Sequence, residues 1–241
     1  MTWGKFYGIG VGPGDPELLT LKALRVLEDI DLLFVPKSRS EKRSLALSIA
    51  AQAIPREWQV VDLILPMTRD RDELARHWQQ AAQQVVELMA AGRSGAFITL
   101  GDPTLYSTFT YLLKYIRRLA PEMEVEIIPG ISAIHLVAAR LQEALAEGEE
   151  SLLIAPAPKN RETLENYLAQ YDNLILMKAG KHVEQIADAL KSKSSSGRAF
   201  LATRCGFHDE FWTDDLASML GKDLDYLSTV LIKNNRGGEG E

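Results

Sequence analysis

Cysteine is nearly absent from this chain of 241 residues. Cys205 is the only one, so an intramolecular disulfide cannot form, and this usage is typical of a reducing compartment. The four histidines show no metal-ligand spacing with one another or with the cysteine. The sequence therefore predicts no metal site.

A membrane-length apolar run and an excess of basic charge are also lacking. The longest stretch without Lys, Arg or Glu runs from Ser94 to Leu113, and Gly101-Asp102-Pro103 interrupts it. The net charge of −6 argues against broad nucleic-acid binding, which needs an extended basic surface. The opening Thr2 to Phe6 leads directly into glycines, unlike a signal peptide. We expect a cytoplasmic protein without nucleic-acid or membrane partners, although a local basic pocket for an anionic substrate remains compatible with these data.

Short apolar segments alternate with helical patterns along the whole chain. Strands are predicted at 5–11, 30–35, 59–65, 95–100, 125–128, 152–155, 174–177, 199–203 and 228–232. Helices are predicted to begin at Pro16 and to span 44–54, 73–91, 106–119, 132–147, 161–170, 183–191 and 215–220. This alternation predicts an α/β protein with mostly parallel or mixed sheets. We expect two α/β domains, 1–128 and 129–233, and a flexible tail at 234–241.

A glycine-rich turn, Gly8 to Asp15, follows the first predicted strand. Asp15 is a good N-cap for a helix with Pro16 at its first position. The turn has the context of an anion-binding loop. However, Pro13 and Asp15 stand where a dinucleotide fingerprint needs its third glycine, and no lysine follows as in a Walker loop. A tight turn and a ligand loop both remain open.

Three further turns stand at predicted strand ends, where α/β sheets hold ligands. In Leu100 to Thr104, Asp102 either organises the turn or accepts hydrogen bonds from a ligand. In Pro129 to Ala133, Ser132 either caps the next helix or faces a ligand. Met177 ends another strand, and its soft thioether suits either the core or a flat ring.

Together, in this order, these turns resemble the tetrapyrrole methylases. That family carries a Gly-Pro-Gly-Asp loop running into LLTLKA, then GDP, then PGIS or PGIT, then a strand-end Met. Here the corresponding segments are Gly10 to Ala23, Gly101 to Pro103, Pro129 to Ala133 and Met177. The resemblance runs from Tyr7 to Lys233, which is nearly the full chain.

The resemblance implies two α/β domains with S-adenosylmethionine in the cleft between them, usually in a homodimer. The family's cofactor contacts fall on Pro13, Leu100, Gly101, Asp102, Leu105, Ser132, Ala133, Met177 and, as a looser match, Cys205. The glycine-rich loop of the family faces the tetrapyrrole, which places Gly10, Gly12, Gly14 and Asp15 on the substrate side.

Within the family, the opening segment is similar to the branch that methylates carbon 20 of precorrin-2 or its cobalt-loaded counterpart, cobalt-factor II, in cobalamin biosynthesis. S-adenosylmethionine is an activated donor, and S-adenosylhomocysteine is its product. The ring carbon is electron-rich, so the enzyme chiefly has to hold the carbon and the methyl group in line. The sequence offers no obvious general base, and Asp102 is the best candidate for a polar catalytic role, orienting the cofactor.

Basic residues follow the second predicted strand, in the segment from Lys37 to Arg43. Guanidinium groups bind carboxylates in two-pronged fashion, so Lys37, Arg39 and Arg43 are candidate clamps for the acetate and propionate groups of the substrate. A solvated basic loop explains the same pattern. Lys178, Lys181 and Arg204 are secondary candidates on the cofactor side.

Two alternatives remain open. One is another methylase of the same fold, acting on uroporphyrinogen III, in a later corrin step, in diphthine synthesis or on ribosomal RNA, although the acidic charge weighs against RNA. The other is a non-catalytic module that binds a nucleotide or a tetrapyrrole without methyl transfer.

Overall fold

The computed structural model describes residues 2–37, 44–66, 68, 70–192 and 197–234. The chain separates into two compact units, Met1–Ser132 and Ala133–Glu241. Each unit is built around its own five-stranded sheet, and each is described by itself. None of the helices in these ranges is long and apolar enough to cross a bilayer.

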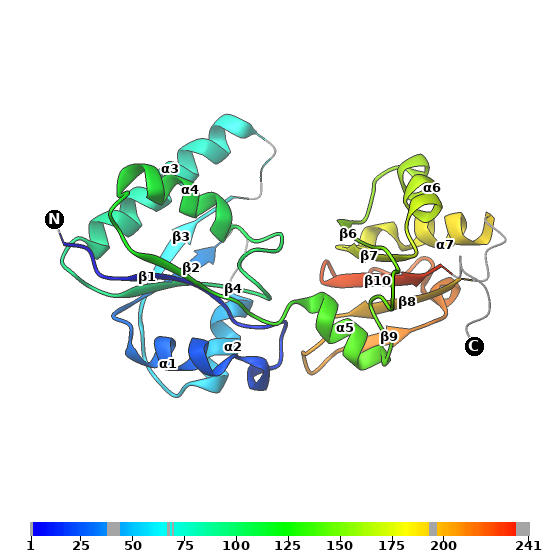
Figure 1. The fold of residues 1–241 in the computed structure, drawn as a ribbon, viewed down its shortest axis with the longest axis horizontal. Coiled ribbons are helices and arrows are strands. Elements are labelled where there is room, and N and C mark those ends of the chain that lie inside the picture. The colour runs from blue at the N-terminus through cyan, green and yellow to red at the C-terminus, as the bar shows by residue number, and fades with distance from the viewer. Residues whose placement is uncertain (1, 38–43, 67, 69, 193–196, 235–241) are drawn as a thin grey trace. The chain divides into compact units, whose positions relative to one another are not determined.

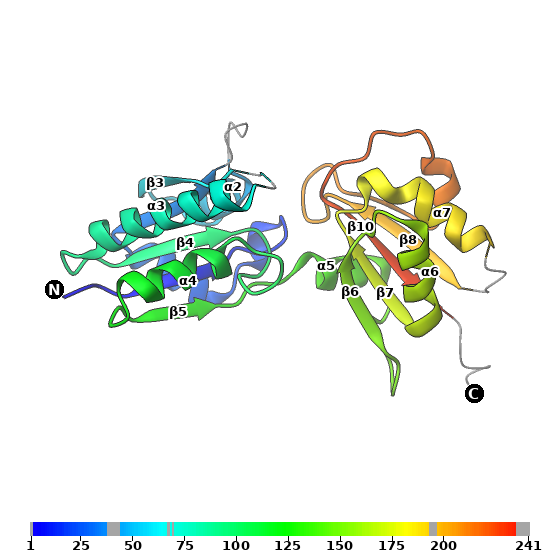
Figure 2. The same cartoon turned by 90° about the horizontal axis from the view of Figure 1, so that it is seen from above.

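The sheet of the first unit is wholly parallel, with the strand order β3-β2-β4-β1-β5. Its strands are β1 (Phe6–Gly10), β2 (Leu32–Lys37), β3 (Gln59–Ile64), β4 (Gly95–Thr99) and β5 (Val125–Ile128). Its α-helices are α1 (Leu21–Asp29), α2 (Leu45–Ala53), α3 (Arg71–Met89) and α4 (Phe109–Leu119). Helices α3 and α4 cover one face and α1 and α2 the other (Figures 1 and 2). Parallel strands are normally covered on both faces, which explains why every residue of β4 is buried.

The first helix begins later than the sequence indicates. Asp15 caps only a short 3₁₀ turn, η1 (Pro16–Leu18), through a hydrogen bond of 2.9 Å from the Glu17 N–H. Thr20 is a second N-cap, because its hydroxyl accepts from the Ala23 N–H at 3.2 Å and α1 starts at Leu21. Two capping side chains five residues apart therefore split the predicted helix in two.

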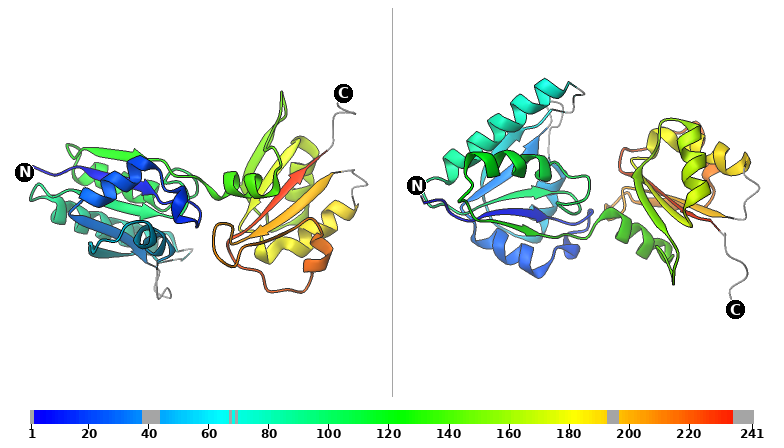
Figure 3. Two further views of the ribbon diagram at one scale, coloured as in Figure 1. Left: turned by 90° about the horizontal axis from the view of Figure 1, so that it is seen from below. Right: turned by 45° about the horizontal axis from the view of Figure 1, so that its top comes forward.

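The sheet of the second unit is mixed, with the order β6-β7-β10-β8-β9; β6 and β7 are parallel, and the remaining pairs are antiparallel. Its strands are β6 (Leu152–Pro156), β7 (Asn173–Met177), β8 (Arg198–Thr203), β9 (Phe211–Thr213) and β10 (Ser228–Lys233). Its helices are α5 (Ala133–Leu141), α6 (Arg161–Gln170), α7 (Val183–Ser192) and the 3₁₀ turns η2 (Gly180–His182) and η3 (Leu216–Met219). Helices α6 and α7 lie together over one face, and α5 packs against β10 (Figures 1 and 3).

Helix α5 ends at Leu141, six residues before the predicted end at residue 147. Gln142 takes a left-handed conformation with φ of 54°. Its N–H bonds to the Ala139 carbonyl at 3.3 Å, and the Glu143 N–H reaches the Ala138 carbonyl at 3.1 Å. This is a Schellman cap, whose left-handed position is usually glycine. The edge strand β9 was also not predicted, because three residues are too few for an alternating pattern.

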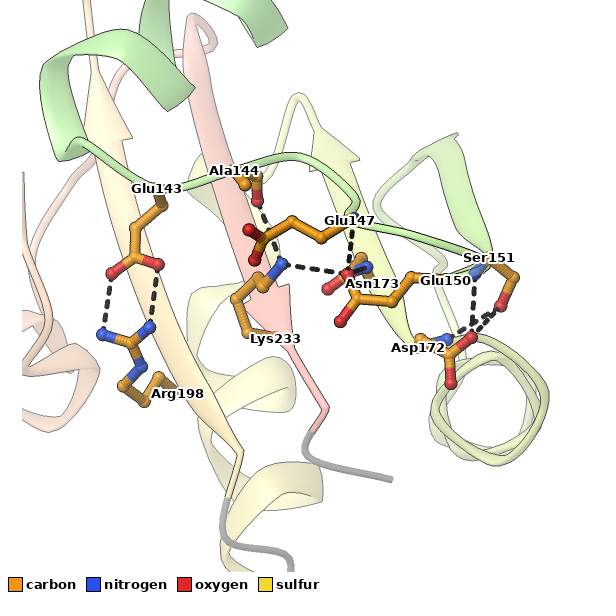
Figure 4. A network of polar contacts seen from close by, with 9 residues as sticks. All are labelled: Glu143, Ala144, Glu147, Glu150, Ser151, Asp172, Asn173, Arg198 and Lys233. Carbon is orange, nitrogen blue, oxygen red and sulfur yellow. Dashed lines mark hydrogen bonds and ion pairs between the residues drawn. The ribbon is translucent and has the colours of Figure 1, made fainter. Parts of the chain in front are cut away.

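A polar network holds the segment after α5 against the amino-terminal ends of β7 and β8 and the carboxyl end of β10 (Figure 4). The Lys233 ammonium is mostly buried and donates to the Ala144 carbonyl at 3.0 Å. Glu150 accepts a hydrogen bond from the Asn173 amide at 2.8 Å. This bond, together with the Glu147 N–H and the Lys233 charge, holds the pKa of Glu150 below its ordinary value. This end of the sheet is therefore fastened by charged side chains.

Candidate functional site

Three of the predicted ligand turns follow β1, β4 and β5 in the first unit. These strands are neighbours in the sheet and run parallel. Their carboxyl ends consequently share one edge, where α/β sheets hold ligands. The turns comprise Gly10 to Asp15, Leu100 to Leu105, and Pro129 to Ser132.

The backbones of these turns touch at three glycines. A Cβ added to Gly10 would lie 2.4 Å from the Gly101 carbonyl oxygen and 2.7 Å from the Gly130 nitrogen. A Cβ on Gly130 would lie 2.3 Å from the same Gly101 oxygen. Real Cβ atoms do not approach backbone atoms so closely, so this junction requires glycine on both sides.

The glycine-rich loop is bonded directly to the turn after β4. Gly12 and Gly101 form an isolated antiparallel bridge, in which the Gly101 N–H donates to the Gly12 carbonyl at 2.7 Å. Both glycines have positive φ, 82° for Gly12 and 70° for Gly101. Pro13 and Gly14 are buried beside them. The loop is thus fixed in place by its neighbour rather than projecting freely.

Asp102 joins the second turn to the third. One carboxylate oxygen accepts from the Thr104 N–H at 2.7 Å and from the Thr104 hydroxyl, while the other accepts from the Gly130 N–H at 3.0 Å. Asp102 therefore organises its turn, which is one of the two roles that the sequence leaves open. Ser132 is buried, and its Cα would lie 3.8 Å from a Cβ on Gly101, so the GDP and PGIS segments are adjacent.

In the second unit, Met177 and Cys205 follow strands that meet the same edge of the mixed sheet. Met177 is the last residue of β7, and Cys205 comes two residues after β8. The first residue of β10, Ser228, lies between those ends, paired with Thr203. Met177 is half-buried, whereas Cys205 is buried. Ala133, the first residue of α5, also belongs to this unit.

Cys205 is a neutral thiol at physiological pH. Burial, reinforced by the nearby Glu210 carboxylate, raises the pKa of Cys205 to about 11. A thiol with so high a pKa is a poor nucleophile and a poor metal ligand. Within the described ranges, no group of three His, Cys, Asp or Glu side chains is placed to hold a metal ion.

The sequence indicates Arg204 only as a basic candidate on the cofactor side and does not reveal its ion pairs. Its guanidinium bonds Asp209 at 2.7 Å and Asp225 at 3.3 Å, and it lies over the Phe207 ring. These carboxylates, Asp209 foremost, raise the pKa of Arg204, and the guanidinium in turn lowers the pKa of Asp209. Its partners stand 5 and 21 residues further along the chain, so no periodic pattern signals the network.

Left-handed backbone conformations occur in the turns that follow several of these strands. Outside glycine, the described residues with positive φ are Tyr106, Gln142, Lys178 and Arg204. Gln142 ends a helix, but the other three stand in the turns after β4, β7 and β8. Such conformations cost about 1–3 kcal/mol each and tend to persist where a binding site requires them. Left-handed non-glycine residues were not considered at the sequence level, although they coincide with three of the selected segments.

The basic candidates for the substrate have different surroundings. Lys37 pairs with Asp62 at 2.8 Å, and both side chains are partly exposed. Lys178 lies over the exposed Tyr226 ring, and Lys181 is exposed. Arg39 and Arg43 lie outside the described residues.

The selected residues therefore divide between the two units. The first unit contains Gly10, Gly12, Pro13, Gly14, Asp15, Leu100, Gly101, Asp102, Leu105 and Ser132. The second unit contains Ala133, Met177 and Cys205.

Three similar proteins are named as C(20)-methyltransferases. A relative from Methanocaldococcus jannaschii, a probable cobalt-precorrin-2 C(20)-methyltransferase, is 38% identical over 95% of this chain and 96% of its own. The cobalt-precorrin-2 C(20)-methyltransferase of Salmonella typhimurium is 32% identical over 95% of this chain and 96% of its own. The precorrin-2 C(20)-methyltransferase of a Sinorhizobium species is 28% identical over 95% of both chains.

Solved structures share the fold. A cobalt precorrin-4 methyltransferase, CbiF, has a TM-score of 0.69 and 18% identity, covering 95% of this chain and 94% of its own. The uroporphyrin-III C-methyltransferase of Thermus thermophilus, complexed with S-adenosylhomocysteine, has a TM-score of 0.67 and 18% identity, covering 95% and 97%. The family model of the tetrapyrrole (corrin/porphyrin) methylases matches residues 5–219. On these grounds the chain belongs to the tetrapyrrole methylases.

Proposed function

We propose that this protein transfers a methyl group from S-adenosylmethionine to carbon 20 of precorrin-2 or its cobalt-containing counterpart, in cobalamin biosynthesis. The observation that supports this best is the near full-length similarity to three C(20)-methyltransferases, at 38%, 32% and 28% identity. The two more similar relatives carry the cobalt-precorrin-2 name. The cobalt-containing compound is accordingly the substrate that we expect to react faster.

The residues of the first unit fit an S-adenosyl group. A Cβ added to Gly101 would meet only the Ser132 Cα within 4 Å, so there is space beside this strand end. Half-buried Leu100 and Leu105 flank that turn, and the buried Ser132 borders it. Apolar walls with a few polar groups suit a nucleoside. We propose Pro13, Leu100, Gly101, Asp102, Leu105 and Ser132 from this unit, with Ala133, Met177 and Cys205 from the other, as the cofactor contacts.

When bound, the cofactor supplies an activated methyl group on a sulfonium. The chain's own contribution is to hold the two reactants in line, which can supply much of the rate acceleration. Asp102 serves this by fixing the turns after β4 and β5 relative to each other, through its bonds to Thr104 and Gly130. Its role is therefore orientation, and the proposal includes no general base.

On the substrate side, we propose that Gly10, Gly12, Gly14 and Asp15 face the tetrapyrrole, as in the family. Lys37, which ends β2, and Arg39 and Arg43, which come after it in the sequence, are the proposed clamps for its carboxylates. The ion pair between Lys37 and Asp62 is partly exposed, so exchange of Asp62 for a substrate carboxylate costs little. We also propose that the protein is cytoplasmic and forms a homodimer. Light scattering on the purified protein tests the dimer.

The decisive experiment incubates the purified protein with methyl-labelled S-adenosylmethionine and each candidate substrate under anaerobic conditions. Mass spectrometry should detect one added methyl, and NMR should place it on carbon 20. Methylation of uroporphyrinogen III instead would favour the alternative methylase. Binding of S-adenosylhomocysteine without transfer to any acceptor would favour the non-catalytic module.

A further inference from the structure

The turn after β8, from Arg204 to Glu210, is held from three directions. Arg204 bonds Asp209 within the turn and Asp225 in the segment before β10. Glu210 accepts from the Gly206 N–H at 2.8 Å and pairs with Arg140 of α5 at 3.2 Å. The Arg204 N–H also donates to the Leu227 carbonyl at 3.0 Å.

Arg204 is central to this arrangement because it links two loops that are distant in sequence. Asp225 uses one carboxylate oxygen for the Leu227 N–H at 2.7 Å and the other for Arg204. The Arg204 side chain is 22% exposed, so these charge-assisted bonds are partly shielded from solvent. Its backbone is left-handed, with φ of 48°, and this cost has to be offset by the surrounding contacts.

We propose that Arg204 is a positioning residue for the cofactor, acting through the turn that carries Cys205. This inference rests on the proposed function. Arg204 was a candidate for binding a free carboxylate, but its guanidinium is already committed to Asp209 and Asp225. By holding both loops, it fixes Cys205 at the edge that also carries Met177. Loss of the guanidinium releases the turn, so the cofactor has to order it on binding and binds more weakly.

The same strand provides a matched control at its opposite end. Arg198 begins β8 and forms a two-pronged ion pair with Glu143, at 2.7 and 2.8 Å (Figure 4). It also lies over the Phe200 ring, as Arg204 lies over that of Phe207. Arg198→Ala therefore removes an arginine with similar contacts, far along the strand from Met177 and Cys205.

The test measures S-adenosylhomocysteine affinity by calorimetry for full-length wild type, Arg204→Ala, Arg204→Lys and Arg198→Ala. Arg204→Ala should raise the Kd about tenfold or more, because charge-assisted bonds are lost. Arg204→Lys should recover part of that loss, and Arg198→Ala should leave the Kd within about twofold. In turnover assays, the KM for S-adenosylmethionine should rise more than kcat falls.

Two results overturn the proposal: an unchanged Kd in folded Arg204→Ala, or an equal rise in Arg198→Ala. If Arg204→Ala does not fold, Asp225→Asn decides, since it removes the negative charge of one partner and keeps the arginine; a Kd equal to wild type then rejects the role. Failure of the wild type to bind S-adenosylhomocysteine would instead reject the proposed function.

Discussion

In the first unit, the turns at the carboxyl edge of the sheet meet through backbone atoms, whereas in the second the turn after β8 is held by charged side chains. Gly10 and Gly130 leave no room for a Cβ against each other and the Gly101 carbonyl, where three strand ends meet. Around Arg204, ion pairs with two carboxylates from separate loops hold the turn in place. The first arrangement should be sensitive to volume and the second to charge.

The largest effect should come from adding one carbon to the glycine junction. In Gly10→Ala the new Cβ meets backbone atoms of Gly101 and Gly130 at 2.4 and 2.7 Å, and backbone cannot move aside as a flexible side chain can. We expect a loss of about 3 kcal/mol or more in the free energy of unfolding. Urea denaturation measures it.

Gly92→Ala is the control for that experiment. Gly92 has a φ of 76°, but an added Cβ meets nothing within 4 Å. Only the left-handed conformation is then penalised, by about 1–2 kcal/mol. Equal losses in the two variants would show that crowding does not govern the junction.

A smaller loss is expected for Asp102→Ala, because the carboxylate that joins the turns after β4 and β5 disappears. Its bonds to Thr104 and Gly130 involve an ionised acceptor, so about 2 kcal/mol of stability should be lost. Asp15→Ala, which removes one capping bond at the same edge, should cost about 1 kcal/mol. If chemical denaturation ranks these two variants in the opposite order, Asp102 does not link the turns energetically.

The smallest effect concerns the charged network of the second unit and depends on pH. Asn173, the Glu147 N–H and Lys233 lower the pKa of Glu150 from its ordinary 4.5. A lowered carboxyl pKa contributes stability above pH 4.5, and that contribution disappears as the pH falls through the folded-state value. Glu150→Gln should therefore cost less than about 1 kcal/mol at pH 7, since Glu150 is partly exposed.

Unfolding curves at pH 7 and pH 4 test this, and the difference between wild type and Glu150→Gln should shrink in acid. Glu149→Gln removes a charge from the same segment and serves as the control. A difference that grows in acid would contradict the assigned direction of the pKa shift.

The same contrast explains what could be predicted from the sequence. Strand β5 and helix α6 have their predicted bounds, because a short, mostly apolar run and a capped helical segment depend on local residues. The contact among the first three turns follows from strand ends meeting at one sheet edge. The ligand roles of their residues stay predictions.

Features that depend on distant or unusual residues could not be predicted. The end of α5 was missed because Gln142 occupies a position where glycine is the usual signal. The Arg204 network was missed because Asp209 and Asp225 become its partners only when two loops fold together. Interactions between loops produce no periodic pattern in the sequence.

The division between the two units falls inside a motif, since Ser132 ends the first unit and Ala133 begins the second. A gene cut at this natural boundary would separate two neighbouring candidate cofactor residues onto different polypeptides. Halves expressed in this way, although each keeps its own sheet, would lack the peptide bond that makes Pro129 to Ala133 continuous. Fragment complementation is therefore better attempted with a cut outside this motif.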